Sequence, residues 1–135
     1  MRHRVKVKKL GRSSAHYKEL VASLVCNLIK ERRIKTTLAK AKIARSFAEK
    51  MVTMARRDTV PARRRAMSAL RQKDAVSSLF TDIVPICVGR AGGYTRIMKL
   101  GRRASDSSEM AILEWVGPVT AVSETETETP AAKDD

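Results

Sequence analysis

The apolar residues in the first part of the chain recur at two different spacings. Between residues 13 and 32 they lie three and four positions apart, which predicts a helix with one buried face. Ser13 or Ser14 can cap its first turn. The next five residues, 33–37, combine alternation with β-branched side chains, which predicts a short strand. The apolar positions of the helix are Tyr17, Leu20, Val21, Leu24, Val25, Leu28 and Ile29.

A second helix is predicted directly after this strand. Thr37 can cap it, and it runs to about residue 57 before residues 58–61 break it. Residues 62–72 predict a third helix with three consecutive arginines in its first turn. Because cations there oppose the helix dipole, an external anion explains them better than a local partner does. The inward-facing residues of the second helix are Ile43, Phe47, Met51 and Met54.

The last third of the chain combines a short helix with two strands. Asp74 can cap the helix, and Pro85 is expected to end it. Residues 94–100 and 110–116 predict two strands joined by a polar link. A chain of 135 residues has room for one modest core. We therefore predict a single compact domain, residues 13–117, of the α/β (α+β) class with about four helices and three strands.

Charge is distributed very unevenly along the chain. It holds 28 basic and 14 acidic side chains, a formal net charge of +14. Residues 1–12 contain six basic residues and no acidic one, and we expect a basic N-terminal arm that an anionic partner orders. Residues 118–135 are rich in Thr and Glu and predict a disordered acidic tail. Residues 1–118 alone hold 27 basic against 9 acidic side chains, or +18, which predicts a polyanionic partner, nucleic acid above all.

Catalysis is not supported by the residues present. His3 and His16 have no matching Ser, Cys or Asp arrangement, and carboxylates are sparse, so no acid–base set can be assembled. Cys26 and Cys87 are isolated in the sequence, which favours two buried thiols in a reducing cytoplasm over a disulfide or a metal pair. We expect no enzyme activity, no cofactor, no metal and no small-molecule substrate.

Secretion and membrane insertion are likewise not supported. The basic start of the chain is followed by no apolar stretch of the kind that a signal peptide has. No segment approaches the ~20 apolar residues that cross a bilayer. We therefore expect a cytoplasmic protein without a membrane partner.

The glycine pair Gly92–Gly93 is the most informative short motif. It is neither a dinucleotide-binding nor a phosphate-binding loop, because a strand follows it. Glycine permits close approach of the backbone to a neighbour, which here is either an RNA backbone or simply the next strand. The residues alone leave these two readings even. The chain has only five aromatic residues, too few for a stacking platform. This disfavours a sequence-specific single-strand binder and favours recognition of backbone shape in folded RNA or duplex DNA.

Several segments together resemble the ribosomal protein L17 family of the bacterial large (50S) subunit. Any one of them is weak, but in this order and over about residues 1–117 they are highly specific. The chain departs from the family at Tyr17, where a basic residue is usual, and in the acidic tail, which is an addition. The segments are residues 1–4, residues 10–12 with Ser14 and His16, residues 34–38 with 40–42, residues 90–97 with Lys99, Gly101 and Arg102, and residues 110–114.

The resemblance implies a small mixed three-stranded sheet packed by helices and a structural role in the large subunit, supporting translation. It further implies that the chain binds and orders 23S ribosomal RNA beside neighbouring ribosomal proteins. Basic side chains would neutralise phosphates and displace counterions. The alternative is a nucleoid-type DNA-binding protein, for which no helix–turn–helix spacing or intercalating wedge is evident. The expected RNA-binding residues are Arg2, His3, Arg4, Lys6, Lys8, Lys9, Arg12, His16, Lys18, Arg32, Arg33, Lys35, Lys40, Lys42, Arg63, Arg64, Arg65, Arg90, Gly92, Gly93, Tyr94, Arg96, Lys99 and Arg102.

Overall fold

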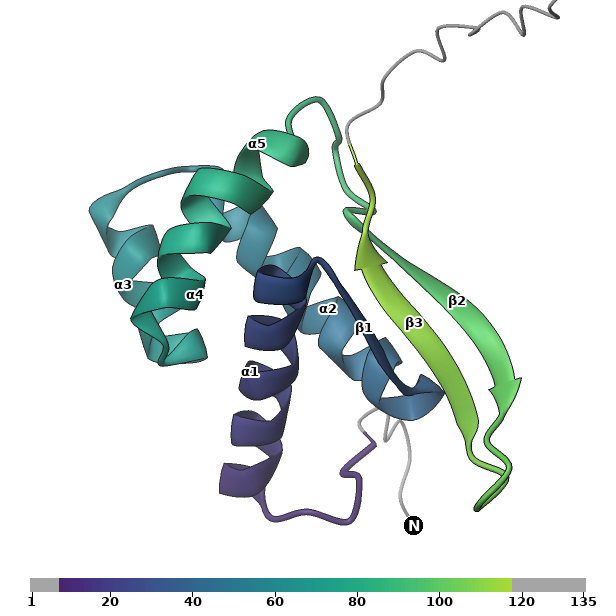
Figure 1. The fold of residues 1–135 in the computed structure, drawn as a ribbon. Helices are drawn as coiled ribbons and strands as arrows, with labels where there is room; N and C mark the ends of the chain where they lie inside the picture. Colours follow the sequence, from purple (N-terminus) through teal and green to yellow (C-terminus); the bar gives the residue numbers. More distant parts are fainter. Residues whose placement is uncertain (1–7, 118–135) are drawn as a thin grey trace, which may run out of the picture.

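The computed structural model describes residues 8–117, in which helices pack on one side of a small sheet (Figure 1). The first long helix, the first strand and the second long helix fall where the hydrophobic spacing predicts them. The elements in chain order are α1 (Ser14–Glu31), β1 (Arg33–Thr37), α2 (Leu38–Ala55), α3 (Val60–Leu70), α4 (Lys73–Ser78), the π-helical turn η1 (Leu79–Ile83), α5 (Val84–Ile86), β2 (Thr95–Arg102) and β3 (Glu109–Trp115).

The sheet has the order β1-β3-β2, so the last strand in the sequence is the central one. Ile34 of β1 and Ile97 of β2 both lie opposite Leu113 of β3. The predicted α+β class with a three-stranded sheet is confirmed. The sheet is antiparallel throughout, however, and not mixed, because β1 and β2 flank β3 and both run against it.

The core lies between the sheet and the two long helices. β3 buries Ala111, Leu113 and Trp115 on its helix-facing side. α2 contacts all three strands, and its buried side includes alanines at helical spacing, such as Ala41, Ala44 and Ala48. Such small side chains let the helix lie close to the sheet at native packing density. The helices α3 and α4 pack beyond α1 and α2, so the opposite face of the sheet stays free of helices (Figure 1).

Pro85 does not end the fourth helix, contrary to the sequence-based expectation. The chain continues through η1 into α5, which reaches Ile86. In η1 the backbone N–H of Val84 donates to the carbonyl of Leu79, so the hydrogen-bond register widens just before the proline. Pro85 is then at the start of a new segment, where its missing N–H costs little. Asp74 lies in the first turn of α4, and Gln72 takes the N-cap position.

Two cysteines lie in the core, as the sequence predicts. Cys26 and Cys87 are both free and fully buried. Burial raises the pKa of each thiol above its ordinary value, so neither is activated as a thiolate. None of the helices in residues 8–117 combines the length and apolar character that a membrane span needs.

We predict that Trp115→Phe destabilises the fold. The indole Nε1 donates to the carbonyl of Leu28 at 2.9 Å inside the core and so links β3 to the end of α1. Phenylalanine removes this donor and leaves a gap, which should lower the free energy of unfolding by about 1–3 kcal/mol. Urea denaturation followed by circular dichroism measures the change. Val88→Ala is the control, because Val88 is exposed, and a similar loss in both variants would contradict the prediction.

Candidate nucleic-acid interface

Arginines and lysines of residues 8–117 differ in whether they form salt bridges. Each salt bridge in this part of the chain uses an arginine, and none of its lysines forms one. Arginine favours such contacts because its planar fork matches a carboxylate. The lysine charges therefore remain available to an outside partner. The pairs are Arg32–Asp82 (3.7 Å), Arg63–Asp58 (2.6 Å), Arg71–Glu19 (2.6 Å), Arg103–Asp106 (2.6 Å) and Arg96–Glu114.

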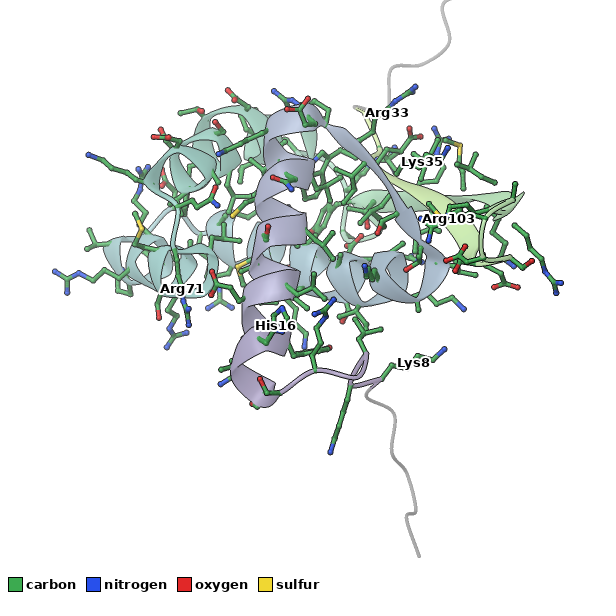
Figure 2. The ribbon with its side chains drawn as sticks, turned by 60° about the horizontal axis from the view of Figure 1, so that its bottom comes forward. Lys8, His16, Arg33, Lys35, Arg71 and Arg103 are labelled. Carbon is green, nitrogen blue, oxygen red and sulfur yellow. The ribbon has the colours of Figure 1, made fainter. Side chains whose placement is uncertain are left out.

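The first group of free cations surrounds the start of α1. Ser13 accepts a hydrogen bond from the backbone N–H of His16, which sets the first turn of the helix. Arg12 Nη1 lies 3.1 Å from His16 Nε2. Lys8 and His16 lie at the same end of the molecule (Figure 2). The expected contacts Lys9 and Lys18 are also exposed at this end of the chain.

A hollow of about 450 Å³ opens beside this group, between α1 and α2. Lys8, Lys42 and Lys50 line it, together with the rings of Tyr17 and Phe47. A second hollow of about 280 Å³ shares Tyr17 and Phe47, and a third of about 380 Å³ shares Lys8 and Lys42. Sequence reasoning missed this groove. It placed Phe47 in the core, against which this residue does pack, and did not include Lys50 among the contacts, although Lys50 lies eight positions from Lys42 on the same helix.

A second group of cations lies on the helix-free face of the sheet. Arg33 and Lys35 of β1 are exposed and project there (Figure 2). The register places Arg33 beside Glu114 of β3, and Glu114 beside Arg96 of β2. Across this row the two arginines flank one carboxylate. The face therefore carries an excess of positive charge.

Arg96 has a structural role that the sequence did not indicate. Its guanidinium pairs with the carboxylate of Glu114, whose side chain is only 12% exposed. A carboxylate at that depth requires a charged partner. The expected RNA contacts Lys99 and Arg102 are exposed on the same strand and form no salt bridge within residues 8–117.

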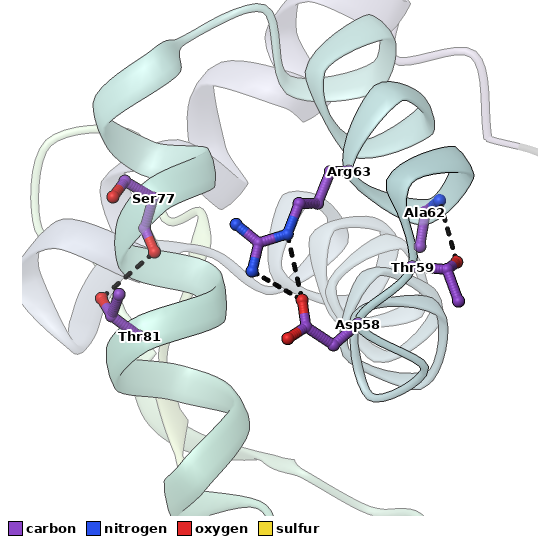
Figure 3. Close-up of polar contacts among 6 residues, drawn as sticks. All are labelled: Asp58, Thr59, Ala62, Arg63, Ser77 and Thr81. Atoms are coloured by element: carbon purple, nitrogen blue, oxygen red, sulfur yellow. Dashed lines mark hydrogen bonds and ion pairs between the residues drawn. The ribbon is translucent and has the colours of Figure 1, made fainter.

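Arg63 also has a local partner, which corrects the expectation that none exists for the arginine triplet. Figure 3 shows its guanidinium turned toward Asp58, with the Nε and Nη2 atoms 3.0 and 2.6 Å from one carboxylate oxygen. The guanidinium also lies over the Phe80 ring, 4.7 Å from its centroid. Arg64 and Arg65 are exposed and form no salt bridge in the described part of the chain. An external anion therefore explains only Arg64 and Arg65 of the triplet.

The glycine pair leads into a set of backbone contacts and not into an open loop. Gly93 has a φ of +66°, a conformation that glycine adopts without strain. The next residue, Tyr94, is 1% exposed, so its ring belongs to the core and cannot stack on RNA, contrary to the expectation from the sequence. Arg56 Nη1 donates to the Tyr94 hydroxyl at 2.9 Å and to the carbonyl of Arg90 at 2.8 Å.

Arg90 completes this set of contacts. Its Nη2 donates to the carbonyl of Gly117 at 3.2 Å and so ties the turn to the end of the sheet. Sequence reasoning missed Arg56, since nothing in the pattern of α2 marks that arginine as facing the turn. A side chain at Gly92 or Gly93 would meet no heavy atom within 4 Å in the described residues, so neither glycine is required by close approach of a strand, and the positive φ of Gly93 is what favours glycine.

Some expected contacts are not described by the structure. Arg2, His3, Arg4 and Lys6 lie outside the described residues, as does the acidic tail. Arg32 pairs with Asp82, whereas Lys40 lies half-buried in the first turn of α2. Within residues 8–117, no three His, Cys, Asp or Glu side chains gather as a metal ion would require.

The fold and these cations define a small basic α+β protein that presents positive charge on several surfaces. Comparison with known proteins gives its family. Residues 20–116 match the model of the family described as Ribosomal protein L17. The chain belongs to this family of structural proteins and is not an enzyme.

Curated relatives cover most of the chain. A protein of Methylacidiphilum infernorum is 48% identical over 115 residues, which is 85% of this chain and 88% of the relative. A protein of Akkermansia muciniphila is 47% identical over 116 residues, which is 86% of this chain and 85% of the relative. Both are named large ribosomal subunit protein bL17. The family resemblance stated from the motifs is confirmed.

We predict that Arg96→Gln destabilises the fold. The substitution leaves the carboxylate of Glu114 largely buried without its cation, which should cost about 1–3 kcal/mol of unfolding free energy. Thermal and urea unfolding measure the change. Lys99→Gln on the same strand is the matched control and should change the stability by less than about 0.5 kcal/mol. Equal stability of Arg96→Gln and the wild type would mean that the pair is not required.

Proposed function

We propose that the chain is a structural component of the large ribosomal subunit that binds and orders 23S ribosomal RNA. The observation that carries this proposal concerns the cations: within residues 8–117 every salt bridge is formed by an arginine, and the lysines keep their charge for a partner. The membership of the Ribosomal protein L17 family supports the same assignment. On this proposal the protein is found on ribosomes in the cytoplasm, beside other ribosomal proteins.

The mechanism is electrostatic positioning. Each Lys or Arg that meets a phosphate releases condensed counterions, and this release supplies the affinity. The folded body fixes where the cations lie, so the RNA segments that reach them are held in one arrangement. Residues 1–12 act as an arm that continues from Lys8 and Lys9 along the RNA, residues 13–117 form the body, and residues 118–135 form a tail that contributes no phosphate contact.

The contacts that we assign to RNA are those whose cations have no internal salt bridge. Arg32, Arg63 and Arg96 are left out because they pair with carboxylates, Arg90 because it holds Gly117, and Tyr94 because it is buried. Gly92 and Gly93 remain as exposed backbone beside these groups. The remaining residues are Lys8, Lys9, Arg12, His16, Lys18, Arg33, Lys35, Lys40, Lys42, Arg64, Arg65, Lys99 and Arg102, with Arg2, His3, Arg4 and Lys6 of the arm.

Co-sedimentation tests the proposal in cells. A tagged chain should move with large subunits in a sucrose gradient, should remain there after deoxyribonuclease treatment, and should be released by ribonuclease. This result follows from an RNA partner, because deoxyribonuclease leaves RNA intact. A chain that deoxyribonuclease releases, and that does not follow the subunit, would support a nucleoid-type DNA-binding protein instead.

We predict a strong salt dependence for binding to 23S ribosomal RNA. If about six phosphates are neutralised, the logarithm of the binding constant should fall with the logarithm of the salt concentration with a slope of roughly −4 to −5. Filter binding over a range of KCl concentrations measures it. The double variant Arg64→Gln, Arg65→Gln should reduce the magnitude of the slope by roughly 1–2. A wild-type slope near zero would contradict the electrostatic mechanism.

We predict that deleting residues 2–7 weakens RNA binding without changing the stability of the body. The deletion removes Arg2, Arg4 and Lys6, so the magnitude of the salt slope should fall by about 2–3. The melting temperature should stay the same, since the core lies within α1–β3. A variant with these three residues changed to Gln is the matched control for chain length. Unchanged affinity in both variants would remove the arm from the interface.

A further inference from the structure

The groove between α1 and α2 combines an apolar surface with a group of lysines. Its floor is apolar and includes Val21 and Ile43 beside the rings of Tyr17 and Phe47, and its lining holds three lysines. No carboxylate lines this hollow or the second one that shares its rings. Both rings are half-buried, so part of each faces the groove. The groove thus offers an apolar surface and positive charge to the same occupant.

The order of residues along α2 sets the spacing of these features. Lys42 and Lys50 are eight positions apart on one face of the helix, which corresponds to about 12 Å along its axis. Ile43 and Phe47 lie between them in the lining. Lys8 adds a further cation where the chain enters from the arm. An occupant therefore meets cations on either side of an apolar surface.

We propose that this groove binds an unpaired nucleotide of RNA, with its base against Tyr17 and Phe47 and the neighbouring phosphates on Lys8, Lys42 and Lys50. The proposal rests on the RNA-binding function proposed above and adds to it a contact with a base. The hollow, about 450 Å³, lies in the range of ~300–1,000 Å³ that is typical of small-molecule pockets.

An unpaired nucleotide fits better than a duplex. In a duplex the flat faces of the bases are stacked on one another, and only phosphates and groove edges are exposed. The apolar floor would then stay in water. In loops and bulges a base can turn outward and stack on an aromatic side chain, and every base has such a face. This mode requires only one or two rings, and the groove brings Tyr17 and Phe47 together although the sequence predicted no stacking platform.

The chain's own arm is the other possible occupant, because Lys8 lines the groove and residues 1–7 precede it directly. Charge argues against it. The arm would bring Arg2, Arg4 and Lys6 to a groove that already holds three lysines, whereas a phosphate backbone neutralises them.

Substitution of Tyr17 tests the proposed contact with the base. A tyrosine has an apolar ring and a hydroxyl that tolerates water, which suits a partly exposed stacking surface. The wild-type chain should bind a short oligoadenylate roughly 5- to 150-fold more tightly than an abasic ribose-phosphate oligomer of equal length, which is the range for stacking one base. Tyr17→Ala should bring this ratio close to one. Tyr17→Phe keeps a ring and should retain the ratio.

Controls separate the base contact from charge and from folding. All Tyr17 variants should keep the wild-type affinity for the abasic oligomer and for a short RNA duplex, and should melt at similar temperatures. Lys42→Gln should weaken binding of the oligoadenylate and the abasic oligomer by similar factors, because it removes a phosphate contact. Crosslinking with an oligomer that carries 4-thiouridine should label the peptide that contains Tyr17 in the wild type.

The other outcomes distinguish failure of the base contact from failure of the proposed function. A wild-type ratio of one, or an unchanged ratio in Tyr17→Ala, overturns the base contact. A ratio that appears only after residues 1–7 are deleted shows that the arm fills the groove. Binding of the duplex and of 23S ribosomal RNA without base dependence leaves the proposed function intact and removes the groove alone. Failure to bind any of these RNAs overturns the proposed function itself.

Discussion

The scarcity of carboxylates is the constraint on which the rest of the molecule depends. Nine acidic side chains serve 27 basic ones in residues 1–118. In the described part of the chain, arginines form the salt bridges, and two of these hold elements together: Arg71 and Glu19 join α3 to α1, and Arg96 and Glu114 join β2 to β3. Bidentate geometry makes arginine the better internal partner, and the compact, strongly hydrated ammonium of lysine the better surface charge. Five of the nine carboxylates thereby pair with arginines inside the fold.

Local patterns predicted the elements well, because their causes are local. The helical spacing of residues 13–32 and the β-branched run of residues 33–37 required no knowledge of distant neighbours, and both elements were confirmed. The order of the strands could not be predicted in the same way. The order β1-β3-β2 depends on how the sheet packs against the helices, which involves contacts between residues far apart in the sequence. The path through Pro85 was missed because a π-helical turn has no marked sequence signature.

The candidate site was harder to predict for a different reason. Sequence identifies a cation but not its partner. Arg63 and Arg64 are neighbours in the chain, yet the first reaches Asp58 and Phe80, whereas the second has no salt bridge in the described residues. Arg56 was missed because its contacts with Arg90 and Tyr94 join residues 34 and 38 positions apart. The apolar groove was missed because its rings come from α1 and α2, and neither helix alone reveals it.

The central place of β3 has a consequence for synthesis of the protein. β1 and β2 have no hydrogen bonds with each other, and each pairs only with β3. Until the last strand has left the translating machinery, the first two have no partner. β2 then meets β3 as a short hairpin, whereas β1 pairs with β3 across 73 to 81 positions of the chain. Such non-local pairing slows folding and leaves strand edges exposed in the meantime. The helical half, whose contacts are nearer in sequence, is free to form first, and the sheet closes as one late event when residues 109–115 arrive.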